Sequence, residues 1–263
     1  MPLSFLHKPA LIVYVTCGDP DLETSREIIL AAIDAGADVI ELGVPFSDPL
    51  ADGPVIQRAS ERALQQRTSL QNVIDLAAAV RRQRAHAGLI IFSYLNPIVR
   101  YGIKRFAGAA SDAGIDGVLL TDMTVEESAE YRRSMHGHKL ATIFLAAPTS
   151  PDDRLQRIAD ASSGFIYAVS RLGVTGAQTD LSSDAQELVA RLRRFTALPI
   201  AVGFGVSNAE QFRVVGSYAD AVVIGSAIVS IIEREGGNAA GAVGQFVRSV
   251  TGQRTSALGS GKL

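Results

Sequence analysis

The stretch Glu41-Leu42-Gly43-Val44-Pro45-Phe46-Ser47-Asp48-Pro49-Leu50-Ala51-Asp52-Gly53-Pro54 carries two carboxylates into a loop rich in proline and glycine. It continues the apolar run 37–42, which glycines bound on both sides and which predicts a short buried strand ending near Glu41. A carboxylate there is costly unless it is paired or its pKa moves. Asp52 stands in a loop that we expect to be non-helical through Pro54. Glu41 is therefore a candidate for acid–base chemistry, although a structural glutamate satisfied by hydrogen bonds fits equally well.

Length and composition indicate a globular protein with enough chain for a large core. The 263 residues are 47% hydrophobic and 20% charged, with a formal net charge of −2. This balance gives no electrostatic reason to expect nucleic acid or a membrane surface as a partner. The single Cys17 excludes an internal disulfide and suits a reducing compartment. No apolar run approaches the roughly 18 residues of a spanning helix, and residues 1–9 lack the features of a signal peptide, so we expect a cytoplasmic protein.

Apolar runs alternate with amphipathic segments along the chain. We expect strands at 10–16, 37–42, 89–93, 117–121, 140–145, 164–169, 198–202 and 221–224. We expect helices at 22–35, 57–66, 70–86, 104–113, from 125, 152–161, 183–195, and from 207, 227 and 240, with a loop at 94–97. Near-continuous apolar strands, each followed by a helix, predict a single-domain (β/α)8 TIM barrel over residues 1–250. Residues 251–263 are expected to form a polar, frayed tail. An open doubly wound sheet is disfavoured because no Gly-x-Gly-x-x-Gly follows the first strand.

The barrel prediction assigns each residue to one end of the strands. Active sites of such barrels lie at the C-terminal ends of the strands. No lysine for Schiff-base chemistry is expected there, and the histidines all precede strands. The remaining groups at this end are acidic: Asp19, Glu41, Asp48, Asp52 and Asp122. The sequence therefore predicts proton transfer by carboxylates, with no metal and no cofactor.

Glycine pairs after the last two strands predict a phosphate site. Gly203-Phe204-Gly205 follows one strand, and Gly225-Ser226 follows the next at a helix start. Loops at these positions commonly form the phosphate cradle of a barrel, where backbone N–H groups and the helix dipole meet the anion. Gly173-Val174-Thr175-Gly176, within the long loop 170–183, could close over the same ligand as a lid. These glycines could instead serve only tight turns.

These residues also carry a family resemblance. The stretch 41–54 closely resembles the signature of the tryptophan synthase alpha subunit. The likeness continues in Tyr14-Val15-Thr16-Cys17-Gly18-Asp19-Pro20, Ser93-Tyr94-Leu95-Asn96-Pro97, Ser170-Arg171-Leu172-Gly173-Val174-Thr175-Gly176, Gly203-Phe204-Gly205-Val206-Ser207 and Gly225-Ser226-Ala227-Ile228-Val229. The resemblance implies a lyase that splits indole-3-glycerol phosphate into indole and glyceraldehyde 3-phosphate for tryptophan biosynthesis. It also implies a beta-subunit partner in an alpha2-beta2 heterotetramer.

The resemblance implies a role for each matching residue. Glu41 would be the general acid and base, and Asp52 would accept a hydrogen bond from the indole N–H. The indole slot would be lined by Tyr14, Phe92, Leu119 and Tyr167, each of which could as easily be plain core, and Thr175 would meet Asp52 when the lid closes. The phosphate would be bound by Gly176, Gly203, Gly205, Gly225 and Ser226. The partner would meet the rim at Asp48, Met123 and Thr124.

The chain departs from the family pattern at its start and at one rim loop. Family members usually carry a helix before the first strand, so either Leu3, Phe5 and Leu6 form a shortened plug or the start is truncated. Met123 stands where the family usually has a proline, which leaves coupling to the partner open. Two other hypotheses are therefore kept: a stand-alone lyase that releases free indole, and a non-catalytic, ligand-binding activator of a beta subunit.

Overall fold

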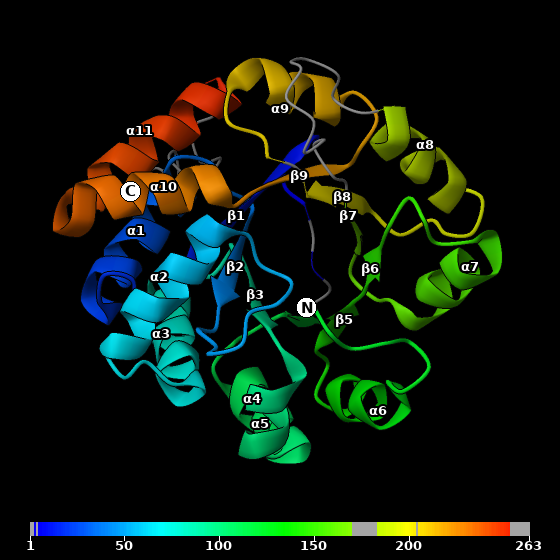
Figure 1. The fold of residues 1–263 in the computed structure, drawn as a ribbon, viewed down its shortest axis with the longest axis horizontal. Helices are drawn as coiled ribbons and strands as arrows, with labels where there is room; N and C mark the ends of the chain where they lie inside the picture. The colour runs from blue at the N-terminus through cyan, green and yellow to red at the C-terminus, as the bar shows by residue number, and fades with distance from the viewer. Residues whose placement is uncertain (1–2, 4, 170–182, 204, 253–263) are drawn as a thin grey trace, which may run out of the picture.

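Parallel strands and helices alternate through the computed structural model, which describes residues 3, 5–169, 183–203 and 205–252 (Figure 1). The strands are β1 (Ala10–Thr16), β2 (Val39–Gly43), β3 (Gly88–Ser93), β4 (Gly117–Leu120), β5 (Ala141–Ile143), β6 (Leu145–Ala146), β7 (Ile166–Val169), β8 (Ile200–Gly203) and β9 (Ala221–Ile224). The helices are α1 (Leu22–Asp34), α2 (Pro54–Gln65), α3 (Leu70–Gln83), α4 (Leu95–Tyr101), α5 (Ile103–Asp112), α6 (Ala129–Gly137), α7 (Asp152–Ala161), α8 (Ser183–Leu192), α9 (Ala209–Gly216), α10 (Ser226–Glu235) and α11 (Ala239–Thr251).

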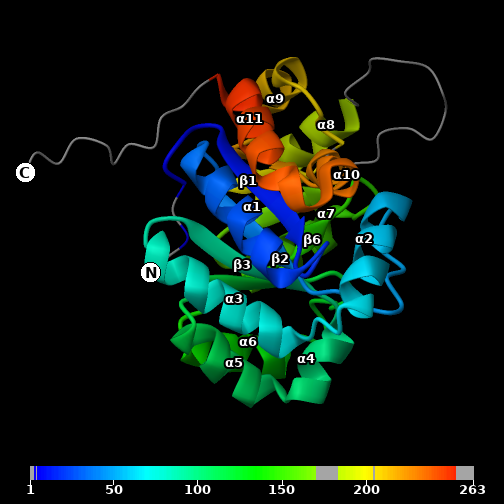
Figure 2. The ribbon, with the colours of Figure 1, turned by 90° about the vertical axis from the view of Figure 1, so that its left-hand side faces the viewer.

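The sheet closes into a barrel through the segment 140–145, which was predicted as a single strand and forms β5 and β6. Its order is β5-β4-β3-β2-β1-β9-β8-β7-β6, and every pairing is parallel. β5 and β6 are separated only by Phe144, whose carbonyl accepts a hydrogen bond from Tyr167 N at 3.1 Å. One chain segment thus bonds to β4 on one side and to β7 on the other. The predicted TIM barrel is confirmed, and the helices form a ring outside it (Figures 1 and 2).

Two proline positions correct the predicted boundaries. Pro54 was expected to be non-helical, but it is the first residue of α2. The first turn of a helix needs no N–H from that residue, and proline's fixed φ suits it. Pro97 lies likewise in the first turn of α4, where a loop was expected. Asp122 Oδ1 accepts from Leu95 N at 2.7 Å, so a carboxylate from the loop after β4 satisfies the start of α4.

The strands have one face toward the barrel axis and the other toward the helices. The inward face is packed with mostly aliphatic residues, which are Ala10, Ile12, Val39, Ile90, Leu119, Ile143, Phe165, Ala201, Ala221 and Val223. A larger cluster fills the layer between the sheet and the helices and includes the buried Cys17. Since a parallel sheet covered on both faces is buried throughout, most positions on both faces of the strands are apolar, and Glu41 is an exception on the inward face.

The N-terminal end of the barrel is closed by the segment before β1. Leu3 and Phe5 pack against the inward cluster, with the Phe5 and Phe165 ring centroids 5.9 Å apart. They form part of the predicted plug, whereas Leu6 is exposed. Asp38 anchors this segment because its buried carboxylate accepts from the backbone nitrogens of Leu6, His7 and Leu11 and contacts the His7 ring.

The predicted tail begins at Thr251, which is the buried last residue of α11. Residues 253–263 lie outside the described part of the chain. Within the described part, no helix has the length and apolar character needed to cross a membrane.

We expect Asp38→Ala to lower the free energy of unfolding by about 3 kcal/mol, because one buried and several part-buried donors lose their acceptor at once. The measurement is urea unfolding followed by circular dichroism. The control is Asp34→Ala, which removes the exposed bidentate pair with Arg84 and should cost at most about 1 kcal/mol. Equal losses in the two variants would contradict the anchoring role of Asp38.

Candidate active site

Glu41 lies inside the barrel, near the C-terminal end of β2. It pairs in register with Tyr14 of β1 and Ile90 of β3, so these side chains share the inward face. Its side chain is fully buried, and neither carboxylate oxygen has a hydrogen-bond partner among the described residues. Burial raises the pKa of Glu41 to about 8. The group is therefore mainly a neutral acid at pH 7. The alternative of a structural glutamate satisfied by hydrogen bonds finds no partner for it among the described residues.

A cavity of about 120 Å³ opens on Glu41 and joins several of the predicted site residues. It is lined by Tyr14, Glu41, Ile56, Phe92, Tyr167, Gly205, Val223, Gly225 and Ser226. The predicted acid, three of the predicted slot residues and three of the predicted phosphate residues thus share one cavity. Ile56 and Val223 were missed by the sequence reading.

Aromatic rings form the walls of this cavity. The Tyr14 and Phe92 rings meet edge to face with centroids 5.1 Å apart. Two glycines make room for the tyrosine hydroxyls. A Cβ at Gly43 would lie 2.4 Å from the Tyr14 hydroxyl oxygen, and one at Gly203 would lie 2.3 Å from that of Tyr167. Gly203, predicted to bind phosphate, therefore has a steric role beneath Tyr167.

Asp52 is held above the barrel by Tyr94. The Tyr94 hydroxyl donates to Asp52 Oδ2 at 3.1 Å and accepts from Ala51 N at 2.9 Å, so one side chain from the loop after β3 fixes the loop after β2. Burial raises the pKa of Asp52 to about 6, against the opposing effect of the Tyr94 hydrogen bond. Asp52 is thus mainly ionised at pH 7, while Glu41 is mainly neutral. Tyr94 lies in one of the segments that carry the family resemblance, but the sequence analysis assigned it no role.

The glycine pairs lie where a phosphate site was expected. Gly225 precedes α10, and Ser226 is the first residue of that helix. The helix start has no side-chain cap, so its first N–H groups are available to an anion. Gly205 reaches the same cavity from the loop after β8. Thr175 and Gly176 lie outside the described residues.

The remaining predicted residues lie away from the cavity. Leu119 is fully buried in the inward cluster and is not among the cavity's lining residues. Asp48 is exposed on the loop before α2. Met123 packs partly against the outer core, and the Thr124 hydroxyl donates to Glu127 at 3.3 Å. The described residues include no group of three or more His, Cys, Asp or Glu that could hold a metal ion.

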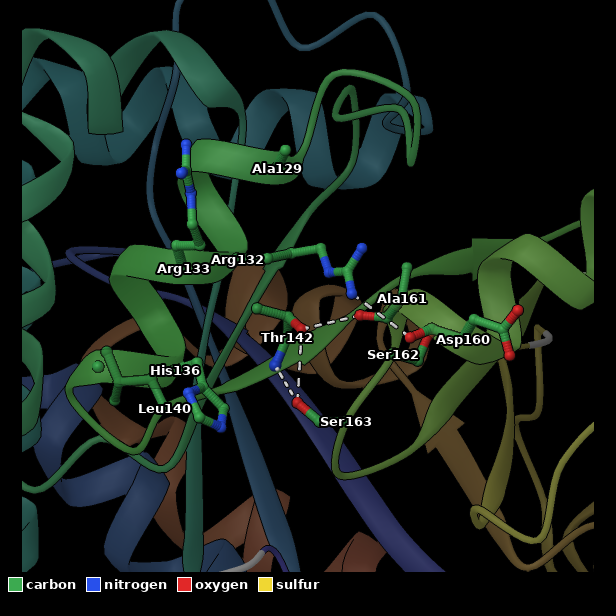
Figure 3. A pocket seen from close by; sticks show the side chains of 11 residues that line it. Ala129, Arg132, Arg133, His136, Leu140, Thr142, Asp160, Ala161, Ser162 and Ser163 are labelled. Atoms are coloured by element: carbon green, nitrogen blue, oxygen red, sulfur yellow. Dashed lines mark hydrogen bonds between the residues drawn. The ribbon is translucent and has the colours of Figure 1, made fainter.

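A wider groove of about 790 Å³ lies between α6 and α7, close to the N-terminal end of β5 (Figure 3). Several of its polar groups form hydrogen bonds within the protein. Arg132 reaches across to donate to the Asp160 carbonyl at 3.4 Å, while Thr142 donates to the Ala161 carbonyl and contacts Ser163. Arg133 extends along α6, away from these groups. Because its basic side chains do not converge, the groove has no arrangement for catalysis.

The smaller cavity, by contrast, combines a neutral buried acid, an aromatic slot and an uncapped helix start. Such a site can transfer a proton to an apolar, aromatic substrate that carries a phosphate at its other end.

Comparison with known proteins agrees with this geometry. Residues 4–256 match the family model described as tryptophan synthase alpha chain. The chain is 49% identical over 234 residues to the tryptophan synthase alpha chain of Solibacter usitatus, covering 89% of this chain and 87% of that one. A mutant tryptophan synthase alpha-subunit of Pyrococcus furiosus superposes with a TM-score of 0.87 at 36% identity, over 93% of this chain and 98% of that chain. The Pyrococcus furiosus tryptophan synthase complex contains a chain with the same TM-score, identity and coverage.

We expect the stability of Glu41→Gln, relative to wild type, to increase with pH. The folded-state pKa of Glu41 lies above its ordinary 4.5, at about 8. Wild type therefore loses stability as the pH rises through this range, whereas glutamine does not titrate. Each unit of raised pKa is worth about 1.4 kcal/mol, so the difference should grow by at least about 1 kcal/mol between pH 5.5 and 8.5.

The measurement is urea unfolding of both proteins across that range. Asp52 titrates in both, so its contribution cancels in the difference. Parallel stability curves would show that Glu41 is not a buried acid with a raised pKa.

Proposed function

The chain belongs to the tryptophan synthase alpha chain family, and we propose that the cavity at Glu41 is where it cleaves indole-3-glycerol phosphate. The products are indole and glyceraldehyde 3-phosphate, and the enzyme is a carbon–carbon lyase of tryptophan biosynthesis. The observation that carries the site assignment is the buried, unpartnered carboxyl of Glu41 in a cavity that also reaches the start of α10.

In this proposal Glu41 moves the proton. The reaction is a retro-aldol cleavage, in which the bond between indole carbon 3 and the glycerol chain breaks. Glu41 gives its proton to carbon 3, and the electron pair of the broken bond returns to the indole ring. The adjacent hydroxyl of the glycerol chain loses its proton to Glu41 and becomes the aldehyde, so no external proton is consumed. A carboxyl with a pKa of about 8 can act as both acid and base near neutral pH.

Asp52 is proposed to stabilise the indole ring during this step. Protonation of carbon 3 makes the ring nitrogen more positive, and an ionised carboxylate aimed at the N–H favours that charge. The two carboxyls differ in environment, since Asp52 accepts a hydrogen bond and Glu41 has none among the described residues. This difference supports a neutral acid beside an ionised stabiliser. Tyr14, Phe92 and Tyr167 would hold the ring.

The phosphate is proposed to bind at the start of α10. Gly225 and Ser226 would offer backbone N–H groups there, and Gly205 would approach from the loop after β8. Gly203 would contribute by leaving room for Tyr167. The cytoplasm is the proposed location.

We expect Glu41→Gln to lower kcat by at least about 100-fold, the usual scale for a positioned acid–base group. Binding of indole and of glycerol 3-phosphate should persist, since glutamine keeps the shape of the side chain. The measurement is steady-state release of indole, with binding of both ligands by calorimetry. Turnover within a few-fold of wild type would remove the catalytic role of Glu41.

A beta subunit is the proposed partner, docked over the C-terminal end of the strands. Leu50 is 93% exposed there and, with Phe46 and Leu64, lines a hollow of about 410 Å³ that also includes Asp48. An exposed apolar side chain in a hollow suits a protein contact. Met123 and Thr124 would lie at the same rim. A docked subunit would receive indole directly and favour the closed site.

We expect indole release by the isolated chain to rise about tenfold or more when a beta subunit is added, which corresponds to about 1.4 kcal/mol of coupling. The measurement titrates the beta subunit against wild type and against Leu50→Asp, which should weaken the response. Full activity alone and no response would favour a stand-alone lyase. Stimulation of the beta subunit without any cleavage would favour a non-catalytic activator.

A further inference from the structure

We infer that Arg62 is a positioning residue that fixes the spacing between the indole end and the phosphate end of the active site. This inference rests on the proposed function. It starts from an ion-pair network that joins the turn after β1, helix α2 and helix α10, none of whose charged groups takes part in the proposed chemistry.

Arg62 uses both edges of its guanidinium. Its Nε and Nη2 donate to Asp19 Oδ1 and Oδ2 at 2.7 and 2.8 Å, and its Nη1 donates to Glu233 Oε1 at 2.9 Å. Asp19 is only 1% exposed, so its buried carboxylate depends on the two hydrogen bonds from Arg62 for compensation of its charge. Arg58 adds a second bidentate contact to Glu233, at 2.8 Å for both bonds. A planar guanidinium makes such paired bonds, and a lysine cannot replace it.

The network holds a helix that apolar packing holds weakly. The buried residues of α2 are Ala59, Ser60 and Ala63, all of them small. Ala59 forms a small apolar cluster with Tyr14 and with Val229 of α10, and Val55 and Ile56 pack against it only partly buried. Since small or partly buried side chains bury little surface, we infer that the charged groups contribute much of what sets the relative position of α2 and α10. Figures 1 and 2 show the two helices side by side.

Each of these helices serves one end of the proposed substrate. α2 begins directly after the loop that carries Asp52, and its Ile56 lines the cavity. α10 begins at Ser226, on the proposed phosphate side. A ligand that reaches both ends binds well only when their spacing is correct, whereas a ligand for one end does not depend on it. Arg62 therefore affects the binding of the whole substrate, because it sets the spacing between the two helices.

The charged groups keep this link over the pH range of an assay. Hydrogen bonds from Arg58 and then Arg62 lower the pKa of Glu233 to about 2. Its partner Arg62 has a raised pKa, mainly through the hydrogen bond to Asp19.

The test compares the whole substrate with its two halves in Arg62→Gln. We expect kcat/KM for indole-3-glycerol phosphate to fall about 10- to 100-fold, while the inhibition constants of indole and of glycerol 3-phosphate change by less than about threefold. The matched control is Arg84→Gln, which removes a similar bidentate pair with Asp34 outside the cavity. It should leave all three constants unchanged.

A second variant, Glu233→Gln, keeps the Arg62–Asp19 pair and removes the carboxylate of α10 that Arg58 and Arg62 bind. It should lower kcat/KM in the same selective way, and the double variant should lose less than the product of the two single losses. This variant carries the test if Arg62→Gln fails to fold. Unchanged cleavage in both variants, or half-ligands weakened as much as the whole substrate, would overturn the inference. Lack of cleavage by wild type would instead overturn the proposed function.

Discussion

The burial of one carboxyl group without a partner is the constraint on which the site depends. Glu41 is placed inside the barrel by strand pairing with β1 and β3, so it cannot turn to solvent without breaking the sheet. A buried carboxyl in this position keeps its proton, since the charged form has no compensating donor among the described residues. The barrel thus keeps Glu41 protonated at the inner end of the cavity lined by aromatic rings, where the side chain is not exposed to solvent.

A second buried carboxylate next to the same strand shows that burial alone does not leave such a group without partners. Asp38 comes directly before β2 and is as deeply buried as Glu41. Backbone nitrogens and the His7 ring surround it, and it anchors the segment that closes the barrel. One end of the strand is therefore flanked by a satisfied carboxylate that supports stability, and the other end holds an unsatisfied carboxyl at the place where we propose the chemistry. TIM barrels commonly divide stability and catalysis between their two ends in this way.

Most of the fold could be predicted because hydrophobic periodicity and glycine boundaries are local signals. The errors came where tertiary contacts or position within a helix decided the outcome. Pro54 and Pro97 suggested breaks, but each lies in the first turn of a helix, where proline is tolerated. The helix was expected to begin at residue 57 and not at Pro54. Ile56 was therefore not considered as a site residue. Glu41 and the glycine pairs were singled out because they lie at the ends of apolar strands or directly after them. Tyr94 and Arg62 were not, because their partners lie far away in the sequence.

Those missed residues share one physical task. The candidate site residues that lie on strands need no further contacts to position them, because pairing within the sheet fixes their backbone. Asp52 and Ile56 belong instead to a loop and helix that pack through small residues, so polar contacts must define where they lie. Tyr94 fixes the loop from the side of β3, and Arg62 fixes the helix from the side of β1 and α10. Such contacts are directional and can be remade, whereas a fully interdigitated apolar core is not easily shifted. The loop that carries Asp52 and helix α2 are therefore positioned by a few directional polar contacts, while pairing within the sheet fixes the residues beneath them.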